Sequence, residues 1–390
     1  MTFRLLLILG ALSAFAPFAI DMYLPSFPSL ALSFATDIEH VQLSLAVYFA
    51  GLASGQLFYG PLADRFGRRL PLLIGIGLFC LASLGCALAP SLPWLIAARF
   101  VQALGGCAGM VIARAVVRDL CEPVAAARAF SQIMLVTGIA PIIAPFAGSL
   151  LLSTFGWQAI FVSLALFAAA CGTAVALWLP ESLPTHHPRP PLRGALRNYL
   201  RLLRDRGFIG HTLTGGIAMA GMFAYISGSP FVLIELYGVA PEHYGWVFGL
   251  NAAGFILLGQ LNARLVVRQG PAFWLRRAVV AYAAAGLILL LVGAFQPKAL
   301  PVLMIPLFFA IALLGGIVPN ASACALAGQG ANAGSASALM GSLQFILAAL
   351  ASSSVGALHN GTVVPMCAVL ALCAVATALM ARWTHRRTPA

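Results

Sequence analysis

Charged residues are scarce in this chain of 390 residues: only 8% are Asp, Glu, Lys or Arg, whereas soluble proteins average about 25%. Hydrophobic residues make up 61%, and the mean hydropathy is +0.97. This composition excludes a soluble globule and predicts a polytopic membrane protein. The formal net charge is +12, but the basic residues fall in short loops, which indicates membrane topology and contact with anionic lipid rather than nucleic-acid binding.

Signatures of several enzyme classes are also missing. The eight cysteines include no C-x-x-C pair, the seven histidines form no H-E-x-x-H or comparable metal pattern, and no G-x-x-x-x-G-K-[ST] phosphate loop occurs. We therefore expect no metal, no cofactor and no use of ATP. An intramembrane enzyme would need a catalytic constellation and a sensor would need a soluble output domain. Neither is visible, so the protein is predicted not to be an enzyme.

Apolar runs near the ~20 residues that span a ~30 Å hydrocarbon core occur twelve times in the chain. Arginines gather at both termini and in every second loop, whereas the opposite loops hold Lys298 alone. By the positive-inside rule, both termini are expected in the cytoplasm. The first 16 residues could pass for a signal peptide, but cleavage would remove much of a helix that continues through Pro17 and Asp21, so an uncleaved first span is favoured.

One long hydrophilic stretch divides the spans six and six. It predicts a first half at residues 1–180, a cytoplasmic linker at 181–207 and a second half at 208–390. Leucines and arginines alternate in the linker as in an amphipathic helix that could lie on the membrane surface. The segment GQLNARLVVR, from Gly259, faintly repeats GPLADRFGRR, from Gly60. The repeat supports two related halves.

The segment GPLADRFGRR is itself a burst of charge between the second and third apolar runs. An ionised side chain in hydrocarbon costs roughly 2.5 to 3.5 kcal/mol, so these charges must lie at an interface. We expect the second span to break at Gly60-Pro61 and to be followed by a tight loop. A basic anchor would explain the arginines, but Asp64 adds nothing to membrane insertion.

The spacing Gly60-x-Leu-Ala-Asp64-Arg-x-Gly67-Arg-Arg resembles the loop signature of the major facilitator superfamily. The resemblance implies two six-helix halves with the substrate site between them. It also implies a cytoplasmic gating loop that, in the outward-open state, approaches the start of the eleventh helix, near Ser335 to Ser337. The residues of this loop are Gly60, Asp64, Arg65, Gly67, Arg68 and Arg69.

Asp21 and Arg99 are charged residues deep inside spans. Asp21 is the only acid clearly within one, and Arg99 falls at a similar depth in the fourth span, so the two side chains could face each other. An intramembrane acid must find a partner or take up a proton, which makes a functional role the default hypothesis. A structural ion pair that fixes the first and fourth helices is the alternative.

Further motifs extend the resemblance over nearly the whole chain. The run from Arg99 to Gly106 resembles the superfamily's helix-4 motif, and 138–148 resembles the helix-5 motif of its exporters, with Ala144 in place of a usual glycine. With DMYLPSFP, RAVVRDL and VPNASACALA, these segments resemble the bicyclomycin-resistance (Bcr/CflA) branch of drug:proton antiporters, which includes phenicol exporters. In those relatives the residues matching Asp21 and Arg99 are implicated in substrate and proton handling. The helix-5 motif residues are Gly138, Pro141, Pro145 and Gly148.

The function expected from this resemblance is proton-driven export of small drug-like compounds of bicyclomycin, phenicol or sulfonamide type across the inner membrane. The alternative is export of an endogenous metabolite or amino acid, with incidental drug efflux. The expected partners are a small-molecule substrate, protons and lipid, and the protein is expected to be a monomer. Polar residues within spans could line the substrate cavity, although those of the second half would equally suit interhelical hydrogen bonds. They are Tyr23, Gln102, Tyr225, Asn251, Asn320 and Gln344.

Overall fold

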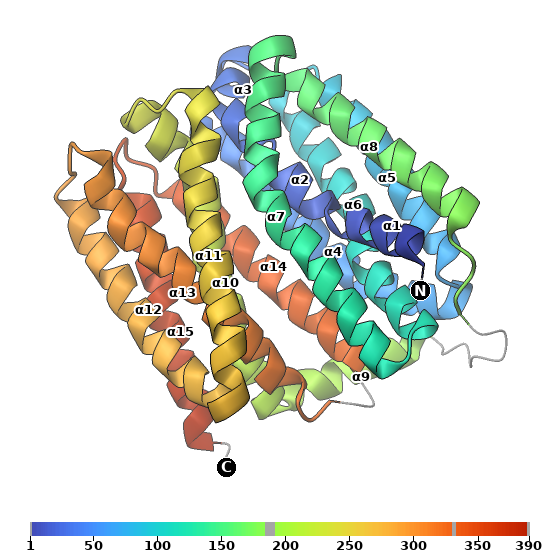
Figure 1. Ribbon diagram of the computed structural model, residues 1–390. Helices are drawn as coiled ribbons and strands as arrows, with labels where there is room; N and C mark the ends of the chain where they lie inside the picture. Colours follow the sequence, from blue (N-terminus) through green and yellow to red (C-terminus); the bar gives the residue numbers. More distant parts are fainter. Residues whose placement is uncertain (1, 184–191, 330–332, 388–390) are drawn as a thin grey trace.

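The computed structural model describes residues 2–183, 192–329 and 333–387, and every regular element within these ranges is helical (Figure 1). Twelve helical segments there are long and apolar enough to cross a membrane. The predicted all-α fold with twelve spans is therefore confirmed.

The first six spans begin with a helix broken into four parts. These parts are α1 (Phe3–Ser13), α2 (Phe15–Asp21), η1 (Leu24–Ser26) and α3 (Phe27–Ser33). The next five are α4 (Ile38–Phe66), α5 (Arg69–Ala87), α6 (Leu92–Leu120), α7 (Pro123–Phe155) and α8 (Trp157–Trp178). Asp21 is the last residue of α2, immediately before a break that leads into the proline-containing turn η1.

Helix α9 (Leu192–Arg204) falls in the predicted linker, of which residues 184–191 lie outside the described ranges. The last six spans are α10 (Arg206–Pro230) with η2 (Phe231–Leu236), α11 (Pro241–Gln269), α12 (Pro271–Ala294), α13 (Leu300–Leu326), α14 (Ala333–Ala357) and α15 (Val364–Arg387). The domain limits at 180 and 208 stay a prediction.

The predicted break at Gly60-Pro61 is wrong, because α4 continues through Pro61 to Phe66. Proline lacks an N–H group and cannot donate to the carbonyl of Leu57 four residues earlier. The Tyr199 hydroxyl of α9 donates to that carbonyl instead, at 3.1 Å. Burial raises the pKa of Tyr199 to about 12, which keeps the donor protonated. Only Gly67 and Arg68 separate α4 from α5, and Gly67 has a φ of 90°, which favours glycine.

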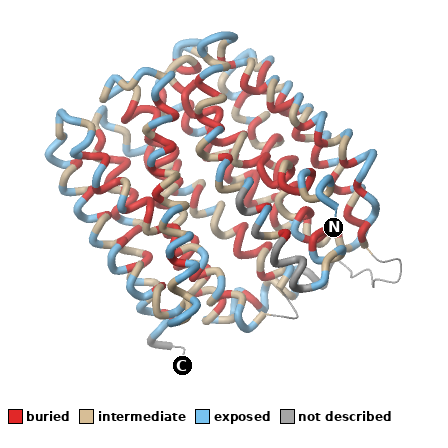
Figure 2. The backbone as a smooth tube through the Cα atoms, in the orientation of Figure 1, coloured by how far each residue is buried: buried red, intermediate tan, exposed pale blue. Residues whose placement is uncertain are grey.

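The first six spans form one side of the molecule and the last six the other (Figure 1). Two helix pairs cross between the sides: α4 packs against α14, and α7 packs against α11. Buried residues concentrate along the inward faces of the helices (Figure 2). We call the contact surface between the two sides the seam.

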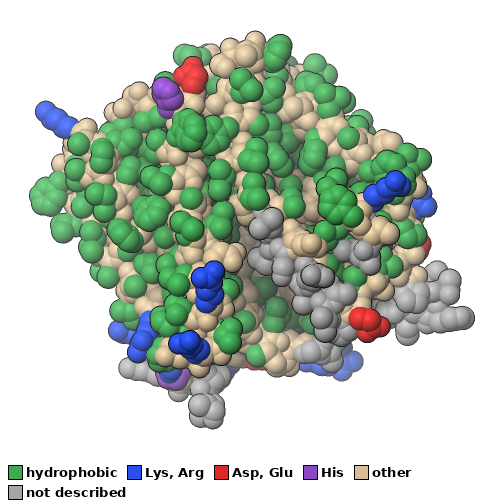
Figure 3. Space-filling model, in the orientation of Figure 1, with side chains coloured by type: hydrophobic (Ala, Val, Ile, Leu, Met, Phe, Trp, Pro, Cys, Tyr) green, Lys and Arg blue, Asp and Glu red, His purple; other side chains and the backbone are tan. Residues whose placement is uncertain are grey.

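The two ends of the bundle differ in charge. The lower end in Figure 3, which we call the basic end, carries most of the visible arginines and lysines and is hollowed between the two sides. It holds Asp64, Arg118, α9 and the end of α15. The opposite end holds the α3–α4 turn and the start of α11.

Candidate transport site

The seam is closed at the end opposite the basic end. The Ser149 hydroxyl of α7 donates to the carbonyl of Pro241 at 2.8 Å. One turn further in, the rings of Phe146 and Trp246 meet edge to face with centroids 4.7 Å apart. Across the other helix pair, His359 Nε2 lies 3.7 Å from Glu39 Oε2. These contacts join the two sides through both crossing pairs.

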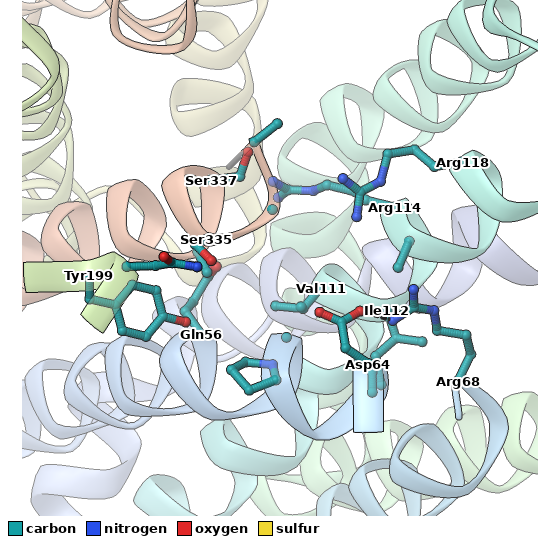
Figure 4. A pocket seen from close by; sticks show the side chains of 18 of the residues that line it. Gln56, Asp64, Arg68, Val111, Ile112, Arg114, Arg118, Tyr199, Ser335 and Ser337 are labelled. Atoms are coloured by element: carbon teal, nitrogen blue, oxygen red, sulfur yellow. Dashed lines mark hydrogen bonds and ion pairs between the residues drawn. The ribbon is translucent and has the colours of Figure 1, made fainter. Parts of the chain in front are cut away.

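At the basic end the two sides separate around a cavity of about 380 Å³ (Figure 4). Its lining comes from α4, α6, α7, α9 and α14. The polar and charged lining residues are Gln56, Asp64, Arg68, Arg114, Arg118, Asn198, Tyr199, Ser335 and Ser337. The structure is therefore open at the basic end and closed at the other.

The charge burst forms a compact network beside this cavity. Arg68 is buried, pairs with Asp64 one helical turn earlier, and donates from Nε to Asp119 Oδ2 of α6 at 2.8 Å. Burial alone would lower the pKa of Arg68, but its hydrogen bonds with Asp119 and Asp64 outweigh burial and raise that pKa. The network ties the end of α4 to the end of α6.

Glu181, just after α8, accepts hydrogen bonds from the backbone N–H groups of Arg68 and Arg69 at 2.8 and 3.1 Å. It thereby caps the start of α5. Burial alone would raise the pKa of Glu181, but these backbone donors outweigh burial and hold it below its usual range. A Cβ at Gly67 would lie 2.5 Å from the Glu181 carboxylate, so a larger residue there would displace this cap in addition to straining the backbone.

The gating prediction for Asp64 concerns a state that this structure does not represent. Here Asp64 pairs with Arg68 and lies across the cavity from Ser335 and Ser337 of α14 (Figure 4). If the basic end closes, the carboxylate approaches the positive end of the α14 dipole, worth about 0.3 to 1 kcal/mol. Its role as a latch stays a prediction.

We expect Asp64→Asn to increase the population open at the basic end by about two- to fivefold, because the neutral amide loses this attraction in the closed state. A Ser337→Cys reporter on a background without the other cysteines measures it, through faster modification by an impermeant maleimide from that side. Asp119→Asn is the matched control, since it removes a partner of Arg68 but no cavity-lining charge. Equal acceleration in both variants would attribute the effect to Arg68 instead.

Arg99 occupies a fully buried aromatic site on α6. Its guanidinium lies over the rings of Tyr48 and Tyr23, at 4.1 and 4.6 Å from their centroids, and donates to Gln102 Oε1 at 2.7 Å. Desolvated cation–π contacts are worth about 2 kcal/mol or more. The Nε and Nη2 atoms nevertheless have no hydrogen-bond partner within the described chain. The guanidinium is therefore held in place by the rings and by Gln102, while two of its nitrogens could still donate to another group.

Asp21 is 3% exposed, and its Oδ1 atom has no hydrogen-bond partner among the described residues. Asp21 lies just before η1, and η1 packs against α10 and α11 of the second side, so the acid lies at the seam. The ion pair considered for Asp21 and Arg99 is not formed: the ion pairs found in the described ranges involve Arg68 and His359. Both side chains are buried, and each keeps at least one polar atom that could bond to a substrate or a proton.

The predicted cavity residues fall into separate polar clusters. Gln102 donates to Ser83 at 2.8 Å, and the Tyr23 hydroxyl bonds to Ser44 at 2.7 Å. On the other side, Asn251 donates to the Tyr225 hydroxyl at 3.0 Å. Asn320 and Asn262 exchange amide hydrogen bonds between α13 and α11, the interhelical alternative, and Gln344 is half-buried on α14. None of the six predicted residues lines the cavity at the basic end, so their contact with substrate stays a prediction.

The helix-5 motif lies on α7 between the broken first helix and α11. A Cβ added at Gly148 would overlap the carbonyl oxygen of Met22, next to Asp21, whereas one added at Gly138 would meet Ile256 at an ordinary 4.0 Å. Pro141 and Pro145 lie inside the helix between these glycines. The motif therefore lets α7 approach the Asp21 segment closely.

We expect Gly148→Ala to lower the free energy of unfolding by about 1 to 3 kcal/mol, because the obstructing atom belongs to the backbone and cannot rotate away. Gly138→Ala, in the same motif, should change it by less than about 1 kcal/mol. Thermal unfolding of both purified variants measures this difference. Equal stability would mean that α2 and η1 shift freely on α7.

Sequence reasoning missed three contributors to these sites: Tyr48, Asp119 and Glu181. Asp119 had a signal, since it follows Arg118 in a charged segment at the end of an apolar run. Tyr48 and Glu181 had none, because their partners lie on other helices.

Taken together, twelve spans, two packed sides and a seam cavity open at one end define a membrane transporter rather than an enzyme. Residues 9–352 match the family model of the Major Facilitator Superfamily, and the chain belongs to that family. It is 38% identical over 375 residues to the uncharacterized MFS-type transporter YdgK of Bacillus subtilis strain 168, which covers 94% of this chain and 92% of the relative. It is 33% identical over 380 residues to the bicyclomycin resistance protein homolog of Haemophilus influenzae, covering 97% and 95%.

The fold also matches a structure titled as the partially occluded inward-open conformation of the xylose transporter XylE from E. coli. The TM-score is 0.75 and the sequence identity is 15%, with 99% of this chain and 98% of the other covered. At that identity, the likeness concerns the fold alone. The predicted superfamily is confirmed, and the relative from Haemophilus supports the resemblance to the bicyclomycin-resistance branch.

Proposed function

We propose that this transporter exports small drug-like compounds of bicyclomycin, phenicol or sulfonamide type in exchange for protons. The name of the Haemophilus relative supports the substrate class. The observation that carries proton coupling is the buried carboxyl group of Asp21 at the seam, one oxygen of which has no hydrogen-bond partner within the described ranges. A carboxylate in that position is costly unless it binds a proton or a cation.

The proposal puts the basic end in the cytoplasm of an inner-membrane protein, in agreement with the positive-inside rule. Substrate enters the cavity at the basic end while the opposite end is closed. Rocking of the two sides about α4–α14 and α7–α11 then opens the opposite end. Protons reach Asp21 from there and leave to the cytoplasm when the basic end reopens.

A growth-inhibition panel tests the substrate class. Cells that express the protein should tolerate higher concentrations of at least one of bicyclomycin, phenicols, sulfonamides or fosfomycin than cells with an empty vector. Cells that produce Asp21→Asn at the same level serve as the control. An endogenous metabolite as the main substrate predicts instead unchanged tolerance, together with loss of a compound from the growth medium when the protein is deleted.

A further inference from the structure

Two arginines in the cavity at the basic end have no counter-charge among the described residues. Arg114 and Arg118 lie one turn apart on α6, are exposed and line the cavity. Neither has an ion pair or hydrogen bond with another described residue. The other charged lining residues, Arg68 and Asp64, pair with each other. The described lining therefore carries two unneutralised positive charges.

The start of α14 faces these arginines. A Cβ at Gly334 would lie 3.9 Å from both terminal nitrogens of Arg118. Figure 4 shows Arg114 and Arg118 reaching from α6 into the cavity on the side of Ser335 and Ser337. A helix N-terminus carries about half a positive charge and free N–H groups. The two guanidinium groups and the positive end of α14 therefore all face the same cavity.

We propose that Arg114, Arg118 and the first turn of α14 form a binding site for a small oxyanion. Guanidinium groups bind phosphate, phosphonate, sulfonate or carboxylate oxygens with two parallel hydrogen bonds. The hydroxyl groups of Ser335 and Ser337 supply further donors on the facing wall. An anion placed between α6 and α14 would neutralise all three positive groups, and about 380 Å³ is enough space for a small molecule.

The bound anion comes either from solution or from the headgroup of an anionic lipid, since both present the same oxygens. In either case it occupies the space that Asp64 needs in order to approach α14. A bound anion therefore holds the basic end open, because it binds only one of the two states. The site lies in the cavity through which the substrate is proposed to enter, but its tests do not depend on the identity of that substrate.

Charge-selective labelling tests the site in the full-length protein. A Ser335→Cys reporter on a background without the other cysteines is treated with anionic sulfonatoethyl or cationic trimethylammonioethyl methanethiosulfonate, and each rate is divided by that for free cysteine. We expect the anionic reagent to react about tenfold faster or more. Inorganic phosphate should slow labelling saturably. Arg114→Gln combined with Arg118→Gln should bring the rate ratio close to one and remove the protection by phosphate.

The control is Arg264→Gln combined with Arg268→Gln, because these arginines have the same spacing on α11 but do not line the cavity. Nanodiscs distinguish the sources: if a lipid headgroup occupies the site, phosphatidylglycerol slows labelling without phosphate, whereas phosphatidylcholine does not. A rate ratio near one in the parent protein, no protection by phosphate or phosphatidylglycerol, or equal loss in the control overturns the proposal. If the Arg114/Arg118 variant does not fold, the labelling-rate ratio of the parent protein and its protection by phosphate still test the proposal.

Discussion

Replacing Asp21 with asparagine should abolish substrate-driven proton movement while leaving the protein in the membrane. The amide is nearly isosteric with the carboxyl group and fits the same buried space, but it cannot bind and release a proton. The carboxyl is 3% exposed at the seam, and the turn η1 just after it packs against α10 and α11 of the other side. A proton bound there is within reach of both sides as they move.

Substrate-induced loss of protons from the lumen of inverted vesicles, or of proteoliposomes whose protein has its basic end outward, measures this effect as a rise in lumenal pH followed with a pH-sensitive dye. The control is Asp37→Asn, which replaces an exposed acid that makes no capping hydrogen bond at the start of α4. We expect the control to match the parent and Asp21→Asn to fall at least about tenfold, as for loss of an essential proton-transfer group. Unchanged flux in Asp21→Asn would move the coupling site elsewhere.

Arg99→Ala should reduce export at least about tenfold, since we expect Arg99 to bind substrate through the donor atoms that have no partner among the described residues. Stability should change less than transport. The substitution loses the contacts with Tyr23, Tyr48 and Gln102, but it also removes the desolvation cost of a buried cation. Arg99→Lys should remain impaired, because an ammonium group cannot reproduce the planar contacts of a guanidinium.

Drug export and the amount of protein in the membrane must be measured together for these variants. Arg276→Ala, an exposed change at the basic end, is the control. Failure of Arg99→Ala to accumulate, with normal accumulation of the control, would favour a purely structural role for the buried arginine. Normal export by a folded Arg99→Ala protein would remove Arg99 from the transport site.

The twelve spans were predictable because the membrane imposes a length of apolar sequence and forces charge into loops. Asp21 could be identified for the same reason, because an acidic residue within an apolar span is costly and therefore rare. The continuation of α4 past Pro61 was not predictable. The Leu57 carbonyl that Pro61 leaves without a backbone donor is bonded by the Tyr199 hydroxyl, 142 residues away in sequence. No local pattern reveals such a partner.

The expected approach of Asp21 to Arg99 came from counting residues along straight helices. The first span is broken at Ala14 and again after Asp21, so depth in sequence does not give position in space. The aromatic site around Arg99 needs Tyr23 and Tyr48 from two other helices, and periodicity cannot show which faces meet. Arg114 and Arg118 were visible as charges in the sequence, but only the packing shows that the nearby Asp119 binds Arg68 and that neither arginine has an ion-pair partner in the described ranges.

The central claim is that a proton gradient drives export, and transport by purified protein in liposomes tests it most directly. An acidic lumen should drive accumulation of a radiolabelled substrate identified by the growth panel in vesicles whose protein has its basic end outward, without ATP. A protonophore should abolish accumulation. Accumulation that persists after the pH gradient and membrane potential are collapsed, or equal accumulation by Asp21→Asn, would contradict the account.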